Sequence, residues 1–117
     1  MSFKDRLGAI CATLPGAVEA HPSEGQLHSW KLADKMFACM GSKDPGVSVK
    51  TPSVETATML IDASVAQRAK YFHRSWVRLP EDVAEEELRH RVQVSYDLIR
   101  GSLSKKMQAG LAEREAI

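Results

Sequence analysis

Apolar positions near the start of the chain recur at helical intervals. Between Phe3 and Leu14 they are three or four residues apart, and the charged run Lys4 to Arg6 lies between them. This spacing is typical of a helix with one buried face. Ser2 is a suitable N-cap and Pro15-Gly16 a suitable stop, so the pattern predicts an amphipathic first helix.

The middle of the chain changes to a two-residue period. Trp30 and Leu32 point to one side of an extended segment and Lys31 to the other, whereas Met36 to Met40 is apolar on both faces. The polar turn Ala33-Asp34-Lys35 separates these arms. We therefore predict an antiparallel hairpin whose second arm is a central strand.

Further strands are expected on both sides of this hairpin. The candidate segments are Ala17 to Ala20, Val47 to Lys50 and Ser75 to Leu79, with turns at Pro22 to Gly25 and Gly41 to Gly46. The segment Val65 to His73 has no clear period and is predicted to be irregular.

Three later helices follow from capping signals and apolar stripes. Thr51 or Ser53 can cap a helix that ends near Ala63 or Ser64. Asp82 and Glu85 have the spacing of a capping box that opens the longest helix, which runs to Gly101. Ser104 can cap a final short helix. The pattern as a whole predicts an α+β fold, an antiparallel sheet packed with helices, in a single domain over residues 1–117.

The cysteine content and the lengths of the apolar runs predict where in the cell the protein is located. The two cysteines, Cys11 and Cys39, lie within apolar patterns and lack a C-x-x-C spacing, which favours buried free thiols in a reducing environment. The longest apolar run, Met36 to Met40, is too short to span a bilayer, and no secretory leader pattern is present. We expect a cytoplasmic protein with no membrane partner.

Charge is unevenly distributed although the net charge is only +1. Between Gln26 and Pro80 eight lysines and arginines face four acidic residues, so the predicted sheet region carries +4. This part of the chain is the candidate surface for an anionic partner.

Several local strings in this order resemble the MmcQ/YjbR family of small bacterial proteins. They are Leu14-Pro15-Gly16-Ala17, Lys31 to Ala38, Ser75-Trp76-Val77, Ser95 to Ile99 and Ser102 to Lys106. The resemblance covers nearly the whole chain. It implies a curved antiparallel sheet with helices packed against it, described as a double-wing arrangement and proposed to bind DNA. It supplies no catalytic motif that could be carried over to this sequence.

Binding of DNA or RNA is the leading functional hypothesis, because cations on a sheet or its loops can neutralise phosphates. The segment Tyr71 to Trp76 also interleaves aromatic and basic residues, as in a stacking platform, although Trp76 is more often expected in a core. We expect weak, salt-dependent binding. The candidate residues are Lys31, Lys35, Lys43, Lys50, Lys70, Arg74 and Arg78.

The alternative is a protein-interaction or small-ligand module. In that hypothesis Trp30, Phe37 and Trp76 line a groove and the segment Val65 to His73 covers it. Clustering of the basic side chains would favour the first hypothesis, and a deep apolar cavity with convergent polar groups the second.

Catalytic and metal chemistry have little support in the sequence. His21, Glu24 and His28 have no established zinc spacing, and Cys39 has apolar strand neighbours that suggest burial. The run Glu85 to Glu87 is typical of a solvated helix start. We expect no metal, no cofactor and no enzymatic activity.

Overall fold

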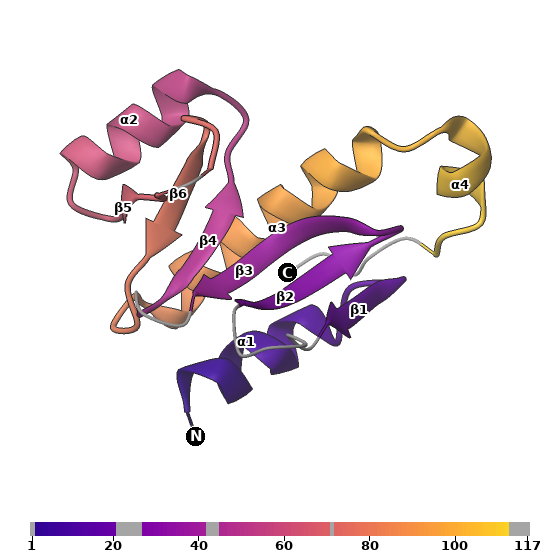
Figure 1. The fold of residues 1–117 in the computed structure, drawn as a ribbon, viewed down its shortest axis with the longest axis horizontal. Coiled ribbons are helices and arrows are strands. Elements are labelled where there is room, and N and C mark those ends of the chain that lie inside the picture. Colours follow the sequence, from indigo (N-terminus) through magenta and orange to yellow (C-terminus); the bar gives the residue numbers. More distant parts are fainter. Residues whose placement is uncertain (1, 21–26, 42–44, 71, 113–117) are drawn as a thin grey trace.

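A six-stranded antiparallel sheet forms the centre of the molecule, and helices pack against it (Figure 1). The computed structural model describes residues 2–20, 27–41, 45–70 and 72–112. The elements in chain order are α1 (Phe3–Cys11), β1 (Ala17–Ala20), β2 (Leu27–Leu32), β3 (Lys35–Gly41), β4 (Val47–Lys50), α2 (Val54–Asp62), β5 (Gln67–Arg68), β6 (Trp76–Leu79), α3 (Glu85–Gly101) and α4 (Lys105–Ala109). The strand order is β1-β2-β3-β4-β6-β5, and every neighbouring pair is antiparallel. The predicted α+β class is confirmed.

The predicted hairpin is β2 and β3, joined by a two-residue turn. Ala33 and Asp34 both have positive φ, 50° and 66°, as a type I′ turn requires. The strands stay in register from Leu32 and Lys35 back to Trp30 and Ala38, apart from one shift between Trp30 and Lys31. This shift leaves Phe37 as an extra residue, a β-bulge in the second arm.

The two central strands β3 and β4 pair over a short stretch. Only Ala38 with Val49 and Cys39 with Ser48 pair there. The next pair in the same register would be Phe37 and Lys50, and a helix side chain takes its place. The hydroxyl of Ser95 on α3 accepts a hydrogen bond from the Lys50 N–H at 2.9 Å and donates one to the Phe37 carbonyl at 2.6 Å. Ser95 thus joins the β1-β2-β3 half of the sheet to the β4-β6-β5 half.

One face of the sheet forms the core. Cross-strand register places Trp30, Ala38, Val49 and Val77 in one row, and each is at most 3% exposed. In Figure 1 α3 runs obliquely behind β3 and β4, and its inward side chains complete this core. These inward residues are Leu88, Val92, Tyr96 and Ile99. Burial of this apolar row and of the α3 stripe is the main stabilising contribution to the fold.

Helix starts agree with the sequence at three of four positions. Ser2, Ser53 and Ser104 each accept a hydrogen bond from a backbone N–H of the first turn. The prediction for α3 was wrong: it begins at Glu85 with Ala84 as N-cap, which has no side-chain cap. The guanidinium of Arg6 holds the preceding segment out of the helix, because it donates hydrogen bonds to the carbonyls of Glu81 and Val83 at 3.3 and 3.2 Å.

The segment Val65 to His73 is more ordered than predicted, since it contains the short edge strand β5, paired with β6. The first helix ends at Cys11, earlier than Pro15-Gly16, and a turn covers the residues between. Several predicted features lie outside the described residues: the Pro22 to Gly25 turn, His21 and Glu24, part of the Gly41 to Gly46 connection, and Tyr71.

Candidate nucleic-acid interface

The face of the sheet opposite the core carries most of the predicted basic residues that lie in strands. Cross-strand register defines it, and we call it the helix-free face: Ser29, Cys39, Ser48 and Arg78 form one continuous row, and the separate pairs Lys31–Met36 and Lys50–Trp76 lie beside it. Within the described residues, Met36 and Trp76 are partly buried but do not pack against the core cluster. The small side chains Ser29, Cys39 and Ser48 are nearly buried, so the longer residues are those that reach solvent.

The register brings three of the predicted basic residues to this face. Lys31 lies on β2, Lys50 on β4 and Arg78 on β6. Lys31 and Lys50 lie on strands that flank β3, and the β3–β4 ladder ends at Ala38 and Val49, one residue before Lys50. Arg78 is on the strand adjacent to Lys50. The sequence alone could not show this clustering, because it depends on the order of strands in the sheet.

Acidic groups are scarce on the strands. The described strands carry five lysines and arginines and a single carboxylate, Glu19. Glu19 lies in the core-side row opposite Trp30, and its Oε2 lies 2.5 Å from Nε2 of His28. Among the described residues, Lys31, Lys50 and Arg78 form no ion pair with a carboxylate. Within the described ranges, the positive charge of the helix-free face is therefore not neutralised by an ion pair.

Arg78 is held in place by neutral groups. Its guanidinium donates one hydrogen bond to the Pro45 carbonyl at 2.6 Å and another to the side-chain oxygen of Gln67 on the neighbouring strand. These acceptors orient the side chain without cancelling its charge, which leaves a positioned cation at one side of the sheet. Gln67 was not singled out by the sequence, because β5 was predicted to be irregular.

An aromatic pair lies beside the cations. Trp76 is the cross-strand neighbour of Lys50, and its ring stacks on Phe72 with centroids 4.7 Å apart and an interplanar angle of 23°. Both side chains remain partly exposed. The preceding turn is fixed by His73, whose Nδ1 lies 2.9 Å from the Ser75 hydroxyl and accepts the Ser75 N–H at 3.1 Å. The helix-free face therefore combines a partly exposed π surface with cations that pair with no carboxylate in the part of the chain that the structure describes.

The remaining predicted basic residues lie elsewhere. Lys35 pairs with Leu32 on the core side, and its ammonium donates to the Ser102 hydroxyl of α3 at 3.1 Å. Lys70 and Arg74 are exposed in the connection between β5 and β6. Lys43 lies outside the described residues.

The predicted ligand groove is not formed by its three aromatic residues. Phe37 is fully buried and meets Tyr96 edge to face, with ring centroids 5.6 Å apart, and Trp30 is 3% exposed in the core row. Trp76 projects from the other face. The β-bulge explains the position of Phe37, because the extra residue turns its side chain toward α3.

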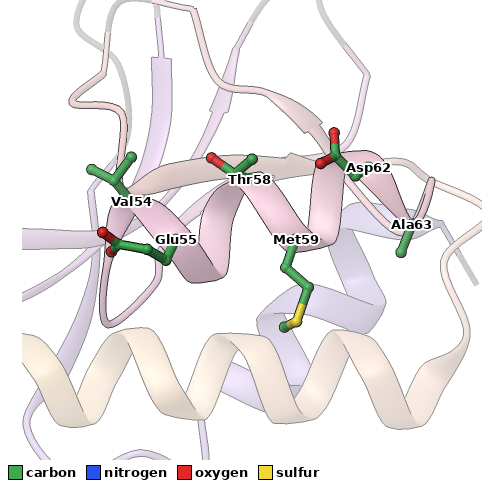
Figure 2. A pocket seen from close by; sticks show the side chains of 6 residues that line it. All are labelled: Val54, Glu55, Thr58, Met59, Asp62 and Ala63. Carbon is green, nitrogen blue, oxygen red and sulfur yellow. The ribbon is translucent and has the colours of Figure 1, made fainter.

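Of the hollows on the described surface, two bear on a possible binding site. The larger, of about 620 Å³, is lined by residues of α2 and its C-cap alone, which Figure 2 shows spread along the helix. Its notable residue is Met59, a large apolar side chain that is 59% exposed because it lies outside the buried stripe of Ala57 and Leu60. The smaller, of about 340 Å³, lies between α1 and the start of α3.

The smaller hollow is lined by a charge network. Glu85 forms ion pairs at 3.2 Å with both Arg6 and Arg89. Hydrogen bonds from Arg89 and Arg6 lower the pKa of the Glu85 carboxyl. Its two guanidinium groups share one carboxylate as their partner, whereas Lys31, Lys50 and Arg78 form no ion pair with a carboxylate of the described residues.

The described residues contain neither an activated cysteine nor a cluster of metal ligands. Burial raises the pKa of the Cys39 thiol, and burial together with the nearby Glu19 carboxylate raises that of Cys11. Both cysteines are free and buried. In the same described residues no set of three or more histidine, cysteine and acidic side chains is arranged to hold a metal ion. No helix of the described chain is long and apolar enough to cross a membrane.

The chain is an α+β protein in which helices pack against one face of an antiparallel sheet. The YjbR family model matches residues 12–98, so the protein is a member of the YjbR family. Among solved structures, it is similar to the crystal structure of Deinococcus radiodurans protein DR2400, described with a DUF419 domain. That likeness has a TM-score of 0.81 at 21% identity and covers 94% of this chain and 88% of the other, which supports the fold. The comparison with curated proteins gives no match.

Proposed function

We propose that this protein is a small cytoplasmic nucleic-acid-binding protein without catalytic activity, which contacts phosphates of DNA through the helix-free face. The observation that carries the proposal is the grouping of Lys31, Lys50 and Arg78 on one face, with no carboxylate pairing any of them in the described part of the chain. Cations in this setting displace condensed counterions from a nucleic acid, and the released ions favour binding. Free, buried cysteines suit a reducing compartment.

The number of cations on the helix-free face determines how steeply nucleic-acid binding should depend on salt. Three phosphate contacts give a slope of about −2.7 for the logarithm of the binding constant against the logarithm of salt concentration. Raising the salt from about 50 to about 200 mM should then weaken binding about 40-fold. The dissociation constant should be micromolar or weaker at physiological salt, as for non-specific binding.

The test is fluorescence anisotropy of a labelled mixed-sequence DNA duplex over this salt range. The variant carries Lys31→Gln, Lys50→Gln and Arg78→Gln, and it should lose most of the salt slope while keeping its circular dichroism spectrum. A matched control carries Lys4→Gln, Lys105→Gln and Lys106→Gln, which remove the same charge from exposed positions on α1 and α4. It should bind nearly as the wild type does.

Two results would contradict the proposal. One is the absence of salt-sensitive binding by the wild-type protein to any nucleic acid. The other is an equal loss of binding in both triple variants, which would show that net charge matters and the helix-free face does not. Either result leaves the protein-interaction role as the alternative, with the exposed Met59 region of α2 as the surface to examine.

A further inference from the structure

We infer that the preferred ligand of the helix-free face is single-stranded nucleic acid, whose unpaired bases stack on the Trp76–Phe72 pair while its phosphates meet Lys50 and Lys31. This inference rests on the function proposed above and specifies the form of nucleic acid that is bound. Its basis is the position of an aromatic stack directly beside Lys50 on the same face, a cation that pairs with no carboxylate among residues 2–20, 27–41, 45–70 and 72–112.

The sheet is too wide to enter a groove of duplex DNA and contact the base edges there. Six strands at about 4.8 Å spacing are about 24 Å wide, twice the width of about 12 Å of the B-DNA major groove. A duplex could touch this face only with its phosphates. The faces of its bases are covered by their neighbours in the stack, so Trp76 and Phe72 would find no partner.

A single strand makes use of both features. Unpaired bases expose their π faces, and stacking on aromatic side chains strengthens binding on the order of tenfold per base with little sequence preference. Trp76 and Lys50 are directly opposed across β6 and β4. Cross-strand neighbours lie about 5 Å apart at Cβ, so a base on Trp76 leaves its phosphate within reach of the lysine ammonium.

The structure also shows why Trp76 can act as a platform. Its parallel stack with Phe72 at 4.7 Å supports the indole from one side, and the pair lies outside the core cluster. The other tryptophan, Trp30, is 3% exposed and stays inside the molecule. The chain contains these two tryptophans and no others, so quenching of the intrinsic fluorescence by a ligand reports on Trp76.

The experiment compares three probes of equal length at low salt: a 12-nucleotide oligothymidylate, an abasic 12-mer with the same phosphates, and a 12-base-pair duplex. The oligothymidylate should bind at least tenfold more tightly than the abasic strand and should quench the tryptophan fluorescence. Trp76→Leu should weaken its binding about tenfold and leave the affinity for the abasic strand unchanged. Lys50→Gln, in contrast, should weaken binding of both strands.

Failure of this inference differs from failure of the proposed function. If all three probes bind with similar salt slopes, the oligothymidylate gains nothing over the abasic strand, and Trp76 is not quenched, the protein binds phosphates and the single-strand inference is wrong. If no probe binds, both are wrong. Should Trp76→Leu fail to fold, the comparison of oligothymidylate with abasic strand in the wild type, together with its fluorescence, still decides the question.

Discussion

The Ser95 bridge between β3 and β4 offers the sharpest test of how this fold is held together. Ser95→Ala removes one hydroxyl that is fully buried and makes two hydrogen bonds, one accepted from the Lys50 N–H and one donated to the Phe37 carbonyl. Both partners are backbone groups with no ladder bond to each other in this register. The substitution therefore leaves a donor and an acceptor unsatisfied between the two halves of the sheet.

The magnitude follows from these two groups. An unsatisfied buried polar group costs about 1–3 kcal/mol, and about 1.5 kcal/mol each is reasonable because Lys50 is only partly buried. Alanine recovers about 0.5 kcal/mol through its higher helix propensity. The net loss should be about 2.5 kcal/mol, which lowers the melting temperature by roughly 10 °C for a chain of this size.

Urea denaturation followed by circular dichroism measures this loss, and amide hydrogen exchange locates it. The Lys50 amide should exchange faster in Ser95→Ala, whereas amides in the hairpin should change less. Ser102→Ala on the same helix is the control, because Ser102 is exposed and should alter stability by about 0.5 kcal/mol or less. Equal stability of the two variants would refute the bridging role, since it would mean that β3 and β4 close directly once the hydroxyl is gone.

Two further predictions concern the helix start and the thiols. Ala84→Ser should stabilise the protein by about 0.5–1 kcal/mol by giving α3 the N-cap that it lacks, with Ala84→Gly gaining less; a loss of stability in urea denaturation would count against the assigned start at Glu85. Cys11 and Cys39 should react about 100-fold more slowly with a thiol reagent at pH 8 in the native protein than in urea, because burial disfavours the thiolate and blocks access. Rapid labelling of either cysteine in the folded state would show that it is accessible.

The sequence predicted local structure well where a pattern was self-contained. The alternation around Trp30 and the apolar run after Met36 defined the hairpin, because both signals lie within a few residues. The serine caps were equally local. The predicted N-cap at Asp82 was wrong because a residue distant in sequence affects the start of α3. Arg6, on the first helix, donates hydrogen bonds to the carbonyls of Glu81 and Val83, just before Glu85. Such a contact has no counterpart in the local pattern.

The sequence predicted which part of the chain carries the basic residues, but it could not predict which face of the sheet each of them occupies. The basic character of the middle region was visible, yet nothing local separated Lys31 and Lys50, which share the helix-free face, from Lys35, which bonds to α3. The β-bulge at Phe37 is the physical reason. An extra residue in one strand changes the face of every side chain beyond it, so the bulge places Lys35 on the core side, where simple alternation back from Ala38 would place it on the helix-free face.

The Ser95 bridge also determines when the sheet can be completed during synthesis. The hydroxyl that joins Phe37 to Lys50 comes 58 residues after the first and 45 after the second. At about 5–20 residues per second, several seconds pass between translation of β3 and of the helix residue that closes its junction with β4. During that interval β3 and β4 can pair at Ala38 and Cys39, but the Phe37 carbonyl and the Lys50 N–H still lack the hydroxyl that satisfies them, and unpaired strand groups are prone to aggregate. The nascent chain is therefore most vulnerable before α3 emerges, and truncation ahead of Ser95 leaves the two halves of the sheet without this link.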